Sequence, residues 1–146
     1  MSSFVLDCSV AVAWLLEDER VPAADALLDR MQGGGEAVVP GLWRPELGNV
    51  LAGAERRGRI GATGIARCLG LLAKLPIVTD PDTGERALRE VLELARREYL
   101  TTYDASYLEL AMRRGLPPAT LDRSLGRAAR RAGVEVLPPV TERPHP

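Results

Sequence analysis

The stretch FVLDCS, residues 4–9, sets the fold expected for this chain. Phe4, Val5 and Leu6 are consecutive apolar residues that favour β structure, so they predict a short buried strand. Asp7 ends that apolar run abruptly. Because Asn or Gly would close a strand equally well, the purpose of this carboxylate depends on whether other acidic residues come to lie near it.

Short apolar runs alternate with longer segments of helical periodicity along the rest of the chain. Further strands are predicted at AVVP (37–40), PIVT (76–79), ATLD (119–122) and VEVL (134–137). Helices are predicted from Ser9, as the capping residue, to about Leu16, and over 21–32, 43–58, 61–75, 83–99, 102–115 and 123–133. This alternation predicts an α/β fold with a mainly parallel sheet, because each parallel crossover needs a helix.

Two acidic residues stand out at the ends of predicted strands, Asp7 after FVL and Asp122 after ATL. In open α/β sheets, functional sites collect beyond the carboxyl ends of the strands. Asp7 and Asp122 are therefore candidate site residues. The alternative for each is that it only caps the helix that follows it.

Two further acidic residues lie on or beside apolar helix faces. Asp104 falls within the stripe Leu100, Tyr103, Tyr107, Leu108 and Ala111, and Glu46 flanks the stripe Trp43, Leu47, Val50, Leu51 and Ala54. Burying a lone carboxylate is costly, so Asp104 should have a partner. The alternatives are that Asp104 caps its own helix and that Glu46 pairs with an arginine.

If Asp7, Glu46, Asp104 and Asp122 converge, their mutual repulsion destabilises the cluster unless a positive group lies among them. Oxygen-only ligands favour Mg²⁺ or Mn²⁺. Mg²⁺ also keeps several waters, which leaves room for a phosphate and a nucleophilic water. The four acids therefore predict a site for one or two divalent ions.

The composition is that of a single near-neutral domain. The 146 residues include 19 basic and 20 acidic side chains, and no basic half indicates duplex DNA binding. Cys8 and Cys68 indicate neither a disulfide framework nor a zinc site. Without a basic leader or a membrane-length apolar run, a cytoplasmic protein with no membrane span is expected. We expect one domain over 1–137 and a frayed proline-rich tail over 138–146, in which His145 is solvated.

Four segments together resemble PIN-domain proteins of the VapC toxin type, the small metal-dependent ribonucleases of bacterial toxin–antitoxin pairs. The segments are LDCSVAVAWLL, VPGLWRPELGNVL, TTYDASYLELAMRRG and ATLDRSLGRAARRAGVEVL. Each is loose alone, but the ordered set is specific and spans the chain to about Leu137. One departure is Pro117 and Pro118, where family members usually have a more aliphatic lead into the strand, and proline there can shorten it.

The resemblance implies a three-layer α/β/α fold in which the first and fourth strands are neighbours. It matches Asp7, Glu46, Asp104 and Asp122 to the family's acidic quartet. Asp7, Asp104 and Asp122 would be metal ligands, and Glu46 a ligand or the base for the attacking water. The resemblance also matches three polar positions that orient the site to Ser9, Asn49 and Thr120.

The same resemblance implies hydrolysis of RNA phosphodiester bonds to a 5′-phosphate and a 3′-hydroxyl, silencing by an antitoxin, and a homodimer. The helices containing VAVAWLL and AADALL, with the Trp43 region, are the expected walls of an antitoxin groove. Trp14 and Trp43 fall in apolar patterns and are expected in the core or an interface.

Single-stranded or loop RNA is the expected substrate, because its bases can be splayed out. Some basic residues can guide its backbone, although solvated helix faces explain most of them: Arg113, Arg114, Arg123, Arg127, Arg130 and Arg131.

Three other functions fit less well. A phosphoacceptor domain needs paired acids after its first strand and a lysine after a late one, whereas Cys8 and Ser9 follow Asp7 here. A haloacid-type phosphatase needs an acid two residues after its nucleophile, and that residue is Ser9. A catalytically inactive PIN-fold interaction module would keep the fold, but the presence of all four acids gives it no support.

Overall fold

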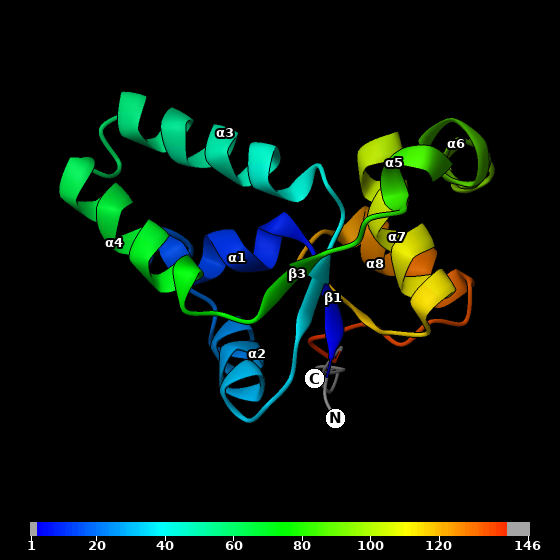
Figure 1. Ribbon diagram of the computed structural model, residues 1–146, viewed down its shortest axis with the longest axis horizontal. Coiled ribbons are helices and arrows are strands. Elements are labelled where there is room, and N and C mark those ends of the chain that lie inside the picture. Colours follow the sequence, from blue (N-terminus) through cyan, green and yellow to red (C-terminus); the bar gives the residue numbers. More distant parts are fainter. Residues whose placement is uncertain (1–2, 140–146) are drawn as a thin grey trace, which may run out of the picture.

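The structure, a computed structural model, describes residues 3–139 and contains a four-stranded parallel sheet (Figure 1). Its strands are β1 (Phe4–Leu6), β2 (Ala37–Val39), β3 (Ile77–Thr79) and β4 (Pro118–Ala119), in the order β3-β2-β1-β4. β1 therefore lies between β2 and β4, with Leu6 opposite Ala119. Because all pairs are parallel, every strand ends at the same edge of the sheet. The expected neighbourhood of the first and fourth strands is confirmed.

Helices connect the strands and cover both faces of the sheet. The first crossover holds α1 (Cys8–Leu15), a 3₁₀ turn η1 (Glu17–Glu19) and α2 (Pro22–Gln32), and the second holds α3 (Trp43–Arg56) and α4 (Ala62–Ala73). After β3 come α5 (Thr83–Arg86), the π-helical segment η2 (Ala87–Val91), α6 (Leu92–Glu98) and α7 (Thr102–Arg114), and α8 (Arg123–Arg131) follows β4. Figure 1 shows α1, α3 and α4 on one side of the sheet and α5 to α8 on the other. The predicted three-layer α/β/α fold is confirmed.

The core lies on both faces of β1. Phe4, Val5 and Leu6 are all fully buried, as expected for a central parallel strand that is covered on two sides. The core extends into α1 and α7, which supply Val10 and Leu108 among other residues. Trp43 is buried as predicted, and Trp14 packs against the core while its indole N–H donates to the Ala24 carbonyl at 2.6 Å.

Two predicted strands differ in extent from those observed. β4 ends at Ala119 instead of running to Asp122, and 134–137 contributes only an isolated bridge between Leu137 and Ala119. Pro118 has no N–H to donate to the ladder. The contact with β1 instead uses the Pro117 carbonyl, which accepts from Val5 N–H at 3.0 Å. β4 is short, as expected for a strand that follows Pro117, but the predicted residues that it lacks, 120–122, come after Ala119 and not beside the prolines.

The single helix predicted over 83–99 is wrong. It is divided into α5, η2 and α6, and it stops at Glu98 because Tyr99 adopts a left-handed conformation with φ of 55°. The helix predicted over 102–115 is confirmed apart from its last residue, Gly115, which ends α7 with φ of 64°.

No helix among residues 3–139 is long and apolar enough to span a membrane. The predicted tail reaches only two residues into this range, so its residues from 140 onward and His145 lie outside the described part of the chain.

Candidate active site

Asp7 is the first residue beyond β1, and only 5% of its surface is exposed. Its N–H donates to the Ala119 carbonyl at 3.0 Å, which continues the pairing of β1 with β4. Two hydroxyl groups donate to the same carboxylate oxygen, Oδ2: Ser9 Oγ at 2.6 Å and Thr120 Oγ1 at 2.7 Å. These donors fix the orientation of the carboxylate and partly offset the burial that raises its pKa.

The same two hydroxyl groups connect Asp7 to the loop after β4. Ser9 Oγ accepts from Leu121 N–H at 2.9 Å, and Thr120 Oγ1 accepts from Asp122 N–H at 3.0 Å. The prediction that Ser9 caps the first helix is wrong, because α1 begins at Cys8 and Ser9 lies within its first turn. From there its hydroxyl reaches both Asp7 and the loop, so Ser9 and Thr120 hold two strand ends together.

Asp122 lies in the loop after β4 that Ser9 and Thr120 connect to Asp7, and it is exposed. Its Oδ1 accepts from Leu125 N–H at 2.9 Å, so the alternative that Asp122 caps its own helix is confirmed for α8. Capping occupies one carboxylate oxygen and leaves the charge in place. That charge raises the pKa of both Asp7 and Asp104.

Glu46 enters the same region from the first turn of α3. Its Oε1 accepts from the hydroxyl of Tyr107, on α7, at 2.7 Å. No arginine pairs with Glu46 within residues 3–139, so that alternative is wrong there. Burial raises the pKa of Glu46, the Tyr107 hydroxyl lowers it, and the negative charge of Asp7 raises it again. The Cys8 thiol lies beside both acids, and its pKa is raised by burial and by their charges.

Asp104 lies in the first turn of α7 and is half-buried. The alternative that it caps this helix is wrong, because Thr101 is the cap and accepts from Asp104 N–H at 3.1 Å. Burial, followed by the charges of Asp122, Asp7 and Glu46, raises the pKa of Asp104 to about 6. Asp104 is therefore within electrostatic reach of all three other acids. Tyr103, predicted in the apolar stripe, is 63% exposed instead.

The acidic groups fit a hard divalent cation in their chemistry. They offer only carboxylate oxygens, and none of the four forms an ion pair within the described part of the chain. No three His, Cys, Asp or Glu side chains in that part lie close enough together to hold a metal ion as they stand. Uncompensated repulsion of the kind that raises the Asp104 pKa is what a bound cation relieves.

Two residues of the site differ from the sequence-based picture. Asn49 lies on α3 one turn beyond Glu46, but it is exposed and makes no side-chain hydrogen bond to the other site residues among residues 3–139. Tyr107 was predicted only as an apolar-stripe residue, yet it is completely buried and bound to Glu46. Tyr107 lies three residues after Asp104 and therefore on the same helix face, and a buried phenol needs a hydrogen-bond acceptor. These two facts could have identified Tyr107 as a site residue from the sequence.

A third acid at a strand end, Asp80, was not singled out from the sequence. It directly follows β3, and its carboxylate accepts from Arg113 Nη2 at 2.9 Å, Arg114 Nη2 at 2.8 Å and Thr83 Oγ1 at 2.6 Å. These donors outweigh burial and hold the Asp80 pKa well below its usual range. Arg113 and Arg114 are thus paired with Asp80 and not free to guide RNA, although Arg114 is still exposed to solvent.

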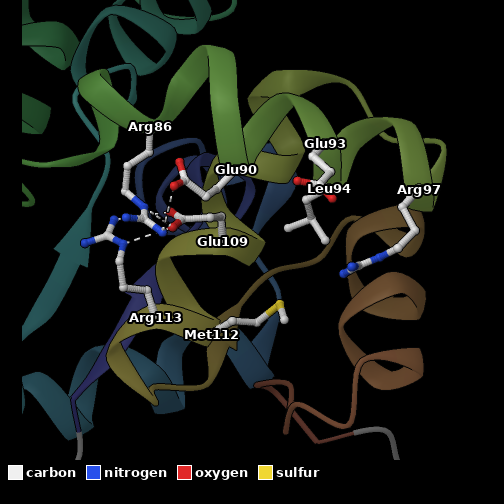
Figure 2. Close-up of a pocket in the computed structure, with 8 residues that line it drawn as sticks. All are labelled: Arg86, Glu90, Glu93, Leu94, Arg97, Glu109, Met112 and Arg113. Atoms are coloured by element: carbon white, nitrogen blue, oxygen red, sulfur yellow. Dashed lines mark hydrogen bonds and ion pairs between the residues drawn. The ribbon is translucent and has the colours of Figure 1, made fainter.

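The cavity shown in Figure 2 is separate from the acidic groups. It has a volume of about 350 Å³ and lies between η2–α6 and α7, where Glu109 binds Arg86 and Arg113. None of the four candidate acids lines it. The candidate active site is therefore the carboxyl edge of the sheet around β1 and β4.

Comparisons with known proteins agree with the fold. A family model described as "PIN domain" matches residues 4–131. Among solved structures, the crystal structure of PAE2754 from Pyrobaculum aerophilum is similar, with a TM-score of 0.62 and 27% sequence identity. The similarity covers 87% of this chain and 79% of that chain. No curated protein matches the sequence.

Proposed function

Because the chain belongs to the PIN domain family, whose members are typically nucleases, we propose that it is a divalent-metal-dependent ribonuclease. It hydrolyses phosphodiester bonds of single-stranded or loop RNA and acts in the cytoplasm as the toxin of a toxin–antitoxin pair. The observation that carries this proposal is the electrostatic coupling of four carboxylates, from four separate segments, at one sheet edge without an arginine or lysine among their partners in residues 3–139.

In this proposal, Asp7, Asp104 and Asp122 hold Mg²⁺ or Mn²⁺. A divalent cation supplies Lewis acidity, since it polarises the scissile phosphate and makes a water molecule more acidic. Ser9 and Thr120 keep the Asp7 carboxylate in one orientation through their hydroxyl groups. Glu46 is either a further ligand or the base that takes the proton of the attacking water, and Tyr107 holds it in place.

The direct test is cleavage of a labelled, unstructured RNA by the purified chain. We expect cleavage with millimolar Mg²⁺ or Mn²⁺, none with EDTA, and products with a 5′-phosphate. Below about pH 6 the rate should fall, because Asp104 becomes protonated and loses the charge that attracts the cation. If no RNA is cleaved and calorimetry detects no Mn²⁺ binding, the chain is instead a catalytically inactive interaction module.

Replacing Tyr107 by phenylalanine should slow cleavage without unfolding the protein. The ring keeps its packing, but Glu46 loses the hydroxyl that fixes its carboxylate. Hydrogen bonds to charged groups contribute about 1.5–3 kcal/mol, so we expect kcat to fall about 10- to 100-fold with little change in KM. Steady-state kinetics measure the effect, and Tyr99→Phe, at a residue that is 96% exposed, is the matched control. A kcat equal to that of the unmodified protein would exclude this role for Tyr107.

The proposed antitoxin binds near the Trp43 region. A cavity of about 340 Å³ lies between α3, α4 and β3, lined by Trp43, Leu47, Leu51, Leu69 and Ile77, with Arg44 at its edge. The Nε1–H of Trp43 is buried and has no acceptor within residues 3–139, so the apolar lining of the cavity, and not this donor, is what supports a partner there. A homodimer is also proposed, and the exposed side chains of Leu88 and Leu92 on η2 and α6 offer apolar surface for it.

A further inference from the structure

Helix α8 carries an unusual concentration of positive charge. Its nine residues include four arginines and no acid, in a chain whose net charge is −1. Leu125, Gly126, Ala128 and Ala129 form its buried face. The spacing of Arg123, Arg127 and Arg130 places these three on one face opposite the core, where all are exposed. They define an arginine stripe that extends over about 10 Å of helix.

The structure divides the six arginines considered as RNA contacts into two groups. Arg113 and Arg114 bind Asp80, and Arg131 binds Glu98 at 3.1 Å. Arg123, Arg127 and Arg130 form no ion pair with any residue in 3–139. Of these six, only the three arginines of the stripe are therefore free to bind an external anion.

The stability of α8 does not explain the stripe. Arg123 occupies the first turn, where the helix dipole disfavours a positive charge, and only Arg130 lies near the favourable C-terminal end. Arg127 also faces like charges four residues before it and three residues after it, and such pairs destabilise a helix. A requirement outside the helix accounts for these charges better than the helix itself does.

We propose that Arg123, Arg127 and Arg130 form a track for the phosphate backbone of the RNA strand at the acidic site, an inference that rests on the nuclease function proposed above. The track begins at that site, because Arg123 directly follows Asp122. When the scissile phosphate of an RNA strand lies at the four acids, the neighbouring phosphates of that RNA also lie close to negative charge. Nearby arginines offset the repulsion between these phosphates and the carboxylates. Tyr103, exposed and adjacent to Asp104, offers a surface on which a base can stack.

The test compares three proteins that all carry Asp104→Asn, so that RNA is bound without being cleaved. The first has no other change, the second has Arg123, Arg127 and Arg130 replaced by glutamine, and the third is a charge-matched control with Arg56, Arg57 and Arg67 replaced by glutamine. The control arginines are exposed and form no ion pair in residues 3–139. They belong to α4 and to the end of α3, and Figure 1 shows these helices on the side of the sheet opposite α8. Fluorescence anisotropy of a labelled unstructured RNA gives the affinity over a salt series.

We expect the α8 variant to lose RNA affinity by about 10- to 100-fold near 0.1 M salt. The slope of log affinity against log salt should become shallower by about 2, since each single-strand phosphate contact contributes about 0.7. The control should keep both values. The α8 variant should also unfold at the same or a higher temperature, because like charges have been removed from its helix.

Three outcomes separate the two proposals. If the unmodified chain cleaves RNA but the α8 variant keeps its affinity and salt slope, the track is wrong and the nuclease function stands. If the unmodified chain cleaves no RNA and the Asp104→Asn protein binds none, both proposals fail. If RNA binding is unchanged while binding to polyglutamate is lost, the stripe serves an acidic protein partner, and the RNA track is overturned.

Discussion

We expect Asp7→Asn and Asp104→Asn each to reduce metal-dependent RNA cleavage at least about 1000-fold while the chain stays folded. A thousandfold loss of rate corresponds to about 4 kcal/mol of transition-state stabilisation, which is the scale of the charge stabilisation that a bound cation supplies. Each substitution removes one negative charge from the coupled group of acids without changing the size of the side chain. Single-turnover cleavage of a labelled RNA at saturating Mn²⁺ measures the loss directly.

Stability measurements distinguish loss of chemistry from loss of fold. The Asp104 pKa is raised, so its contribution to stability is fully present below the unfolded value of about 4 and is lost as the pH rises through about 6. The Asp104→Asn variant cannot ionise at this position, so it does not lose this stability as the pH rises. After allowance for the half-exposed position of Asp104, the variant should be more stable at pH 7 by about 1 kcal/mol without metal. Thermal unfolding at pH 4.5 and pH 7 tests this difference.

The matched control is Asp29→Asn, because Asp29 is exposed on α2, away from the carboxyl edge of the sheet. It should cleave RNA as fast as the unmodified chain. Undiminished cleavage by both Asp7→Asn and Asp104→Asn would refute the assignment of the active site. Loss of cleavage together with loss of the folded state at pH 7 would contradict the sign of the electrostatic argument.

The general placement of the acids could be predicted from the sequence because it follows from local rules. A buried apolar run ending in Asp7 marks the carboxyl edge of a parallel sheet, and helical periodicity places Asp104 on the inner side of α7. These rules need only neighbouring residues. The order of the strands came instead from a resemblance between whole motifs, since apolar runs do not reveal which strand pairs with which.

The contacts of the acids could not be predicted, because their partners are far apart in the sequence. Tyr107 and Glu46 are 61 residues apart, and Thr120 and Asp7 are 113 residues apart. The sequence position of Asp122 is compatible both with capping α8 and with facing the site, so the hydrogen bond that it accepts from Leu125 N–H could not be predicted. Asp80 was not singled out, although it directly follows the strand predicted at 76–79, and its arginine partners on α7 lie 33 and 34 residues further along the chain.

Asp80 also carries the largest stability effect that we expect from one substitution. Asp80→Ala should lower the free energy of unfolding by about 3 kcal/mol, because it leaves Arg113 in a largely buried position with only Glu109 as partner. The substitution also removes the acceptor for the Thr83 hydroxyl and Asp82 N–H at the start of α5. Chemical denaturation at pH 7 measures the loss, and Asp82→Ala, an exposed acid two residues away, is the control.

The pH dependence of stability gives this prediction a second, independent test. Because the Asp80 pKa is lowered, its stabilisation is present above the unfolded value of about 4 and is lost as the pH falls below it. Asp7, Glu46 and Asp104 have raised pKa values and act in the opposite direction, because their contribution to stability increases as the pH falls toward about 4. Asp80→Ala should therefore flatten the loss of stability below pH 4 and leave the change between pH 4 and pH 6 intact. An acid profile identical to that of the unmodified chain would show that Asp80 is not the ion-paired carboxylate that joins β3 to α7.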